Sequence, residues 1–228
     1  MFRPFILPSV NDRQLTAMSN RDHLEELFTR YPLLADCRPQ ITQAAEMLIA
    51  CFRRGNKLLL AGNGGSAADC LHIAGELLKG FNLPRPLPPE ERAALIAGFG
   101  DDGARLADGL QRGLPAIALP AELSLLTAVA NDMNPELIFA QGVLALGAPG
   151  DALLAISTSG AARNIIAAAR VAQWRTMTTI ALTGRDGGEL ARVCDVTIIA
   201  PGANTAEIQE HHQPIYHALC ATIEAELF

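Results

Sequence analysis

Short, almost wholly apolar runs recur along the chain and alternate with longer amphipathic segments. The apolar runs lie at 57–62, 115–120, 151–157, 178–184 and 196–200. Runs of this length without polar alternation are typical of strands that are buried on both faces of a sheet. The chain therefore predicts five strands in the interior of one domain.

The segments around these strands carry apolar residues at helical spacing. We expect helices at 21–34, 39–54, 66–79, 122–131, 135–147, 161–174 and 205–227. Strands that alternate with helices indicate parallel pairing, because a parallel connection needs a crossover. The fold class is therefore α/β: a three-layer sandwich in which a five-stranded parallel sheet is flanked by helices.

The pattern also divides the chain. Residues 1–20 are polar and punctuated by proline, and we interpret them as an N-terminal arm. Residues 21–228 form one domain with a Pro-rich insertion at about 82–114, which carries two weak helical patterns. We expect this insertion to be a partly ordered surface excursion, acting either as a lid near the site or as an inert decoration.

Composition narrows the function classes. A formal net charge of −6 argues against a general nucleic-acid surface, which needs clustered Lys and Arg. The five cysteines are scattered without a CxxC pair, which indicates reduced thiols in the cytoplasm rather than disulfides. We see no signal peptide and no apolar stretch approaching the roughly 20 residues of a membrane span.

Two Gly- and Ser-rich loops follow predicted strands. Loop 1 is Gly62-Asn63-Gly64-Gly65-Ser66, and loop 2 is Ser157-Thr158-Ser159-Gly160. Ligands of open α/β sheets bind beyond the carboxyl ends of the strands, and a helix N-terminus favours an anion. Together the loops indicate a phosphate monoester. The alternative is that Ser66 and Ser159 only cap their helices.

A second group of residues is suited to acid/base or metal chemistry. His72 and Glu76 are four apart, hence on one helical face, and Gln209 and His217 point broadly the same way from the last helix. His, Glu and Gln are credible zinc ligands. The residues alone leave two other interpretations open: His72 and Glu76 could be a pair on a helix surface, and the histidines of the last helix could be an ordinary polar face. Similarly, an Asn-Asp pair such as Asn131 and Asp132 is often only a turn or cap.

Five motifs give the chain a resemblance to a known family. They are GNGGSAADCLHIAGEL, VANDMNPELIF, GDALLAISTSG, ALTGRDGG and EIQEHHQPIYH. In kind and order they resemble the phosphoheptose isomerases, which are built on the SIS (sugar isomerase) domain. The resemblance covers residues from about 40 to the end, apart from the insertion.

This resemblance implies a fold, an assembly and a reaction. Family members have a flavodoxin-like five-stranded sheet, assemble as homotetramers and place their active sites between subunits. They convert sedoheptulose 7-phosphate into a manno-heptose 7-phosphate for bacterial surface polysaccharides. We therefore expect a cytoplasmic aldose–ketose isomerase that binds a phosphorylated sugar and one zinc ion per subunit, with neither nucleic acid nor membrane as a partner.

The resemblance also implies roles for individual residues. Substrate-binding positions are Asn63, Gly64, Gly65, Ser66, Glu76, Asn131, Asp132, Ser157, Thr158, Ser159 and Gln209. Zinc ligands are His72, Glu76, Gln209 and His217, and Glu76 and His217 are also the acid/base pair.

The chain departs from the family pattern at three places. Ala162 stands where the family usually has a further Ser, and Arg163 or a backbone group is the candidate to compensate. Pro214 removes a hydrogen bond from the last helix and is expected to kink it. The 81–114 segment is much longer than in the typical enzyme.

Other functions remain open at this point. A non-catalytic SIS adaptor that binds the bacterial replication initiator is the main alternative, and an isomerase for another ketose phosphate is a second. A sugar-phosphate-sensing regulator is a third, although no helix-turn-helix module or basic extension is visible. The presence of four residues distinguishes an isomerase from an adaptor, because an adaptor has no physical need for all of them: His72, Glu76, Gln209 and His217.

Overall fold

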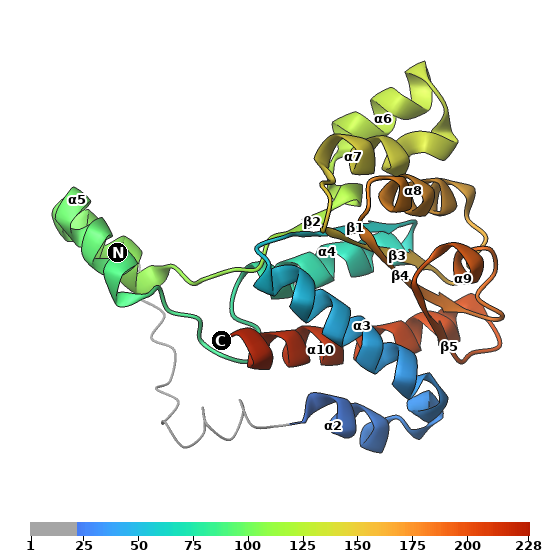
Figure 1. Cartoon of the computed structure of the whole chain (residues 1–228), viewed down its shortest axis with the longest axis horizontal. Helices are drawn as coiled ribbons and strands as arrows, with labels where there is room; N and C mark the ends of the chain where they lie inside the picture. Colours follow the sequence, from blue (N-terminus) through green and yellow to red (C-terminus); the bar gives the residue numbers. More distant parts are fainter. Residues whose placement is uncertain (1–21) are drawn as a thin grey trace.

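The computed structural model describes residues 22–228, and the predicted arm at 1–20 lies outside them. Its sheet contains β1 (Leu58–Gly62), β2 (Ala116–Ala118), β3 (Ala152–Ser157), β4 (Thr178–Gly184) and β5 (Val196–Ala200). The strands are ordered β2-β1-β3-β4-β5 and every neighbouring pair is parallel (Figure 1). This confirms the predicted fold class.

Helices cover both faces of the sheet (Figure 1). They are α2 (His23–Arg30), α3 (Arg38–Arg53), α4 (Gly65–Leu78), α5 (Pro89–Gly109), α6 (Leu123–Asp132), α7 (Ile138–Leu146), α8 (Arg163–Trp174), α9 (Leu190–Val193) and α10 (Thr205–Leu227). The 3₁₀ helices are η1 (Pro32–Cys37), η2 (Leu119–Ala121) and η3 (Pro135–Leu137). Within residues 22–228, no helix combines the length and hydropathy that a membrane crossing requires.

Two of the sequence predictions need correction. The helix expected at 21–34 ends at Arg30, because Pro32 starts the 3₁₀ helix η1 and the residue before a proline is pushed out of the α conformation. The strand expected at 115–120 is only three residues long, since Pro120 falls within the 3₁₀ turn η2. The short helix α9 was not predicted.

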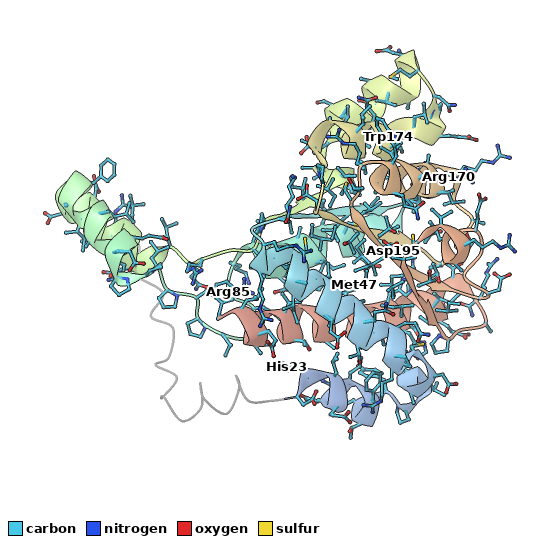
Figure 2. The ribbon with its side chains drawn as sticks, viewed as in Figure 1. His23, Met47, Arg85, Arg170, Trp174 and Asp195 are labelled. Carbon is cyan, nitrogen blue, oxygen red and sulfur yellow. The ribbon has the colours of Figure 1, made fainter. Side chains whose placement is uncertain are left out.

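The Pro-rich insertion is a helical hairpin that stands apart from the body (Figure 1). Gly100, at φ 56° and ψ −128°, breaks α5 into two arms. The arms pack closely: Arg92 donates to the Ala107 carbonyl and lies 2.6 Å from an Asp108 carboxylate oxygen. An antiparallel bridge between Pro86 and Gln111 forms the stalk. Figure 2 shows Arg85 where this stalk leaves the body.

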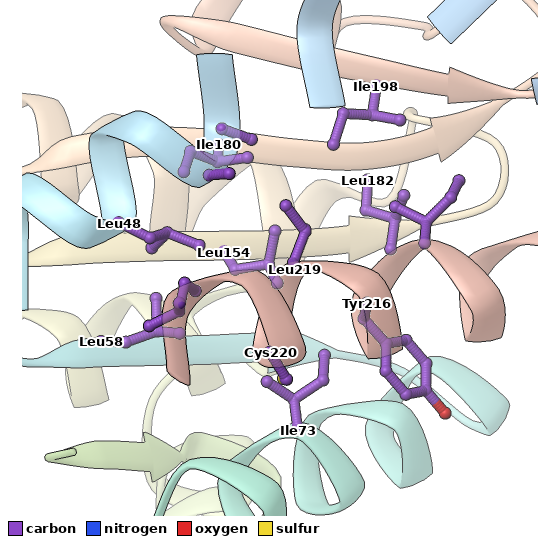
Figure 3. Close-up of a cluster of buried hydrophobic side chains, with 14 of the residues drawn as sticks. Leu48, Leu58, Ile73, Leu154, Ile180, Leu182, Ile198, Tyr216, Leu219 and Cys220 are labelled. Atoms are coloured by element: carbon purple, nitrogen blue, oxygen red, sulfur yellow. The ribbon is translucent and has the colours of Figure 1, made fainter. Parts of the chain in front are cut away.

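Alternate strand residues face two separate cores. Leu58 and Leu60 point to the side covered by α2, α3, α4 and α10, whereas Leu59 and Ala61 point to the side covered by α7 and α8. Figure 3 shows the first core, in which residues of α4 and α10 meet those of the central strands. This alternation explains why the strand runs are apolar throughout.

The helices α4 and α10 lie side by side and run in the same direction. Gly65 at the start of α4 lies against Gln209, and His72 further along α4 lies against His217. Helix α10 runs from Thr205 to Leu227 and continues through Pro214. The pairing of these two helices decides which side chains meet beyond the sheet.

Candidate active site

The two glycine-rich loops meet because β1 and β3 are neighbours in the sheet. In an order of the 2-1-3-4-5 type, the chain changes direction between these two strands, and ligands bind at that switch point. Loop 1 leaves the carboxyl end of β1 and loop 2 leaves that of β3. The topology therefore places both predicted phosphate loops at one edge of the sheet.

A pair of side-chain amides joins the two loops. Asn63 in loop 1 donates to Asn164 at 2.9 Å, and Asn164 donates back at the same distance. Asn164 lies in the first turn of α8, directly after loop 2. Asn164 was not among the predicted site residues, although its position four residues after Gly160 was an available signal.

Neither loop serine is a helix N-cap. Helix α4 is preceded by Gly64 and helix α8 by Ala162, both without a side-chain capping bond. Ser66 is buried, at 3% exposure, within the first turn of α4. The Ser159 hydroxyl accepts the Ala161 N–H at 3.2 Å inside loop 2. The interpretation of these serines as simple caps is therefore wrong.

Loop 2 requires glycine at its last position. Gly160 has φ 62°, and a Cβ added there would lie 1.9 Å from the carbonyl oxygen of Gly187. The motif ALTGRDGG thus supplies a second glycine-rich turn against which loop 2 rests. Close backbone packing of this kind is possible only where no side chain intervenes.

Three of the predicted chemical residues converge between α4 and α10. The Nε2 atom of His72 lies 3.2 Å from Oε1 of Glu76 and 3.5 Å from Nε2 of His217. The His72 side chain is 41% exposed and that of Glu76 is 17% exposed, so the group borders solvent. Two nitrogens and a carboxylate oxygen at these spacings can exchange protons.

Tyr216 and Asp69, which were not predicted from the sequence, form a hydrogen-bonded chain that ends at His72. The Tyr216 hydroxyl lies 3.0 Å from Nδ1 of His72 and 3.4 Å from Oδ1 of Asp69. Asp69 precedes His72 by one helical turn, and Tyr216 is adjacent to His217. Both therefore carried a positional signal that only the pairing of the two helices makes visible.

Comparisons with known proteins decide the family. The SIS domain matches residues 116–225, and a related SIS domain matches residues 31–100. A phosphoheptose isomerase of Trichlorobacter lovleyi is 41% identical over 208 residues, covering 91% of each chain. One from Shewanella sediminis is 44% identical over 191 residues, covering 82% of this chain and 84% of its own.

The chain belongs to the phosphoheptose isomerase family. The solved structure of phosphoheptose isomerase GmhA from Neisseria gonorrhoeae matches with a TM-score of 0.66 and 35% identity, covering 92% of this chain and 94% of that one. The agreement thus extends over nearly the whole length of both chains.

Gln209, the fourth residue of the expected zinc set, lies near the start of α4 in the single chain. Gln209 packs against loop 1, so that a Cβ added to Gly65 would lie 2.5 Å from its Nε2 atom. Eight residues separate Gln209 from His217, which is about 12 Å along a helix axis at 1.5 Å per residue. The structure therefore groups His72, Glu76 and His217, and places Gln209 beside the predicted phosphate end.

The other histidines of α10 have structural partners. His212 is fully buried and bonds the Thr183 carbonyl through Nε2 at 3.0 Å, and its burial lowers its pKa to about 4. Its ring is therefore neutral at pH 7 and joins α10 to β4. His211 lies 2.9 Å from the Pro201 carbonyl through Nδ1. Of the three histidines, only His217 reaches the predicted site.

His217 also lines a cavity of about 280 Å³. The cavity lies between α2, α10 and the segment at Phe81 and Asn82. Burial and the neighbouring His72 lower the pKa of His217, while Glu76 opposes that shift. These influences favour a neutral His217 that can accept a proton.

The Asn131–Asp132 pair and Arg163 have local partners in the single chain. Asn131 and Asp132 end α6 as exposed residues, and their side chains bond each other at 2.7 Å. In the part of the chain that the structure describes, no hydrogen bond or ion pair joins them to His72, Glu76 or His217. Arg163, which with a backbone group was the candidate to replace the missing serine, pairs with Glu136 at 3.0 Å.

Proposed function

We propose that this protein is an aldose–ketose isomerase that converts sedoheptulose 7-phosphate into D-glycero-D-manno-heptose 7-phosphate in the cytoplasm. The observation that carries the proposal is the convergence of His72, Glu76 and His217 beside two loops joined by the Asn63–Asn164 pair. Membership of the phosphoheptose isomerase family supports the same reaction.

The reaction needs two proton transfers at carbon. A base removes a proton from carbon 1 of the ketose, which gives an enediol, and a proton then returns to carbon 2. The oxygen protons exchange in compensation, so that atoms balance. Glu76 and His217 flank His72 and supply a carboxylate and an imidazole, which are the usual groups for such transfers.

The phosphate end of the substrate binds across the two loops. Loop 1 offers the backbone amides of Gly64 and Gly65 and the Ser66 hydroxyl, and loop 2 offers Ser157, Thr158 and Ser159. Both loops precede helices, whose N-termini favour an anion. Gln209 beside Gly65 is placed to contact the substrate between its phosphate and its reacting carbons.

Zinc is part of the proposal, with His72, Glu76, Gln209 and His217 as its protein ligands. Ligands at 2.0–2.1 Å around tetrahedral zinc lie about 3.3 Å apart, close to the two spacings made by His72. Across residues 22–228, no three His, Cys, Asp or Glu side chains lie close enough together to form a complete metal-binding cluster. Zinc binding would therefore require the Glu76 and His217 side chains to move closer to each other. A bound zinc ion would polarise the substrate carbonyl.

The test is an isomerisation assay of the purified protein over a panel of five- to seven-carbon ketose phosphates, with zinc content measured in parallel. We expect turnover to be fastest with sedoheptulose 7-phosphate. Fastest turnover with another ketose phosphate would correct the substrate while keeping the reaction. No turnover with any member, together with tight binding to a replication initiator protein, would establish the adaptor instead.

We also propose that the chain assembles as a homotetramer, with the α4 helix near a subunit boundary. The exposed apolar side chains Leu71 and Leu78 on α4 support this, since each is about half exposed in the single chain. Light scattering at micromolar concentration tests the assembly, and a monomer would exclude it. The role of the helical hairpin as a lid stays a prediction.

A further inference from the structure

The Tyr216 hydroxyl lies between a carboxylate and an imidazole. It is 3.4 Å from Oδ1 of Asp69 and 3.0 Å from Nδ1 of His72. The tyrosine ring is buried in the core, at 2% exposure, and Figure 3 shows it extending from α10 beside α4. The packing of the ring therefore fixes the position of the hydroxyl.

A count of protons determines the direction of these hydrogen bonds. Within residues 22–228, Tyr216 is the only hydrogen-bond donor to Asp69, whose Oδ2 atom is buried without a partner. An ionised carboxylate can only accept, so the single tyrosine proton goes to Asp69. The tyrosine oxygen is then free to accept a proton from Nδ1 of His72.

This direction decides what the other nitrogen of His72 can do. A neutral imidazole carries one proton, so a proton on Nδ1 leaves a lone pair on Nε2. That atom faces Oε1 of Glu76 at 3.2 Å and Nε2 of His217 at 3.5 Å. Two acceptors at hydrogen-bond distance repel each other unless a cation or a proton lies between them.

We propose that Tyr216, oriented by Asp69, is a positioning residue that holds His72 in its Nδ1–H tautomer and so presents the Nε2 lone pair toward Glu76 and His217. The purpose of this tautomer rests on the proposed function, because a metal-binding imidazole needs that lone pair. The test of the tautomer is independent of the proposed function, since the tautomer is a property of the metal-free protein.

The experiment compares the wild type with Tyr216→Phe, which removes the hydroxyl and keeps the ring. Long-range ¹H–¹⁵N NMR of the metal-free proteins reads which nitrogen of His72 is protonated, and chelator competition measures zinc affinity. We expect the Nδ1–H tautomer in the wild type and its loss in Tyr216→Phe. We expect zinc affinity to fall about 10- to 100-fold, as is usual for a residue behind a metal ligand.

Two further variants keep the result interpretable. Tyr31→Phe removes the other tyrosine hydroxyl of the chain, which has no hydrogen bond to Asp69 or His72, and should leave both readouts unchanged. Asp69→Asn turns the acceptor into a group that can donate to the tyrosine oxygen. The Tyr216 proton is then redirected to Nδ1 of His72, and the tautomer should change to Nε2–H.

An Nε2–H tautomer in the wild type would overturn the inference, as would an unchanged tautomer in Tyr216→Phe and Asp69→Asn. These outcomes are distinct from failure of the proposed function. A protein that isomerises none of the ketose phosphates, yet shows the expected tautomers, would retain the positioning role of Tyr216 and lose only the reaction assigned to the site.

Discussion

Arg85 and Glu224 form an ion pair that is sealed from solvent, with Nε to Oε1 at 2.8 Å and side chains that are 0% and 1% exposed. Glu224 also accepts the backbone N–H groups of residues 81, 82 and 83. Arg85 donates to the Leu77 carbonyl as well. One carboxylate near the end of α10 therefore fixes the segment from which the helical hairpin departs.

Removing one partner of this pair should be costly. Arg85→Met leaves the Glu224 carboxylate buried without its counter-charge, and we expect a loss of about 3–5 kcal/mol in the free energy of unfolding. The matched control is Arg53→Met, which breaks the ion pair between Arg53 of α3 and Glu226 of α10, where both side chains are more than half exposed. That change should cost less than about 1 kcal/mol in urea unfolding. Equal losses in the free energy of unfolding for the two variants would contradict the structural importance of the buried Arg85–Glu224 pair.

Glu76→Gln tests the proposed chemistry. The amide keeps the shape of the side chain and cannot accept a proton as a base, so turnover should fall by at least ~10²-fold. Binding of the phosphate end should survive, because loops 1 and 2 are untouched. Turnover is measured together with deuterium wash-in from solvent at carbon 1. The control is Glu46→Gln, which changes an exposed glutamate of α3. A Glu76→Gln protein that exchanges at the wild-type rate would remove Glu76 from the mechanism.

Two glycines of α4 should respond differently to alanine. Gly65→Ala places a methyl group 2.5 Å from the end of the Gln209 side chain, which must move away from loop 1. We expect KM for the sugar phosphate to rise by about 3- to 10-fold, corresponding to one lost hydrogen bond of roughly 1 kcal/mol.

The comparison is Gly75→Ala, where nothing lies within 4 Å of the added methyl group. That variant should keep its KM and gain about 0.5–1 kcal/mol in stability, because alanine favours a helix more than glycine does. Steady-state kinetics and thermal unfolding separate the two cases. An unchanged KM in Gly65→Ala would exclude Gln209 from substrate binding.

Burial of His212 should make the fold sensitive to acid. Its pKa is lowered to about 4 in the folded chain, from 6.5 when unfolded, so the unfolded chain binds the extra proton between these values. The free energy of unfolding is therefore unaffected by this residue above pH 6.5. It falls as the pH decreases from 6.5 toward 4, by about 3 kcal/mol in total.

The measurement is urea unfolding at pH 7 and pH 4.5. His212→Gln can still donate to the Thr183 carbonyl and does not titrate, so its stability should change less between the two pH values than that of the wild type. His211→Gln alters the adjacent position and should keep the wild-type difference. If His212→Gln showed the full wild-type decline, the acid sensitivity would come from other groups.

Much of the fold could be predicted from local pattern. The strands at 178–184 and 196–200 and the helix at 205–227 agree with the structure residue for residue. Continuous apolar runs mark the strands, and the Asn204 side chain, which accepts the Ala206 and Glu207 N–H groups, caps the helix; both signals act over short distances. The hairpin within the insertion could not be predicted with the same clarity. Its helices are weakly patterned, and its turn depends on the positive φ of Gly100.

The candidate site likewise contains one relationship that is local in the sequence and others that depend on tertiary packing. His72 and Glu76 are four apart on one helix, so their position on one helical face follows from local spacing alone. The meeting of His72 with His217 and Tyr216 was decided by the packing of α4 against α10, across 145 and 144 residues of chain. Likewise, only the sheet order placed Asn63 against Asn164. Spacing along a helix is a local property, whereas the partner that a face meets depends on how buried apolar surfaces of distant elements pack together.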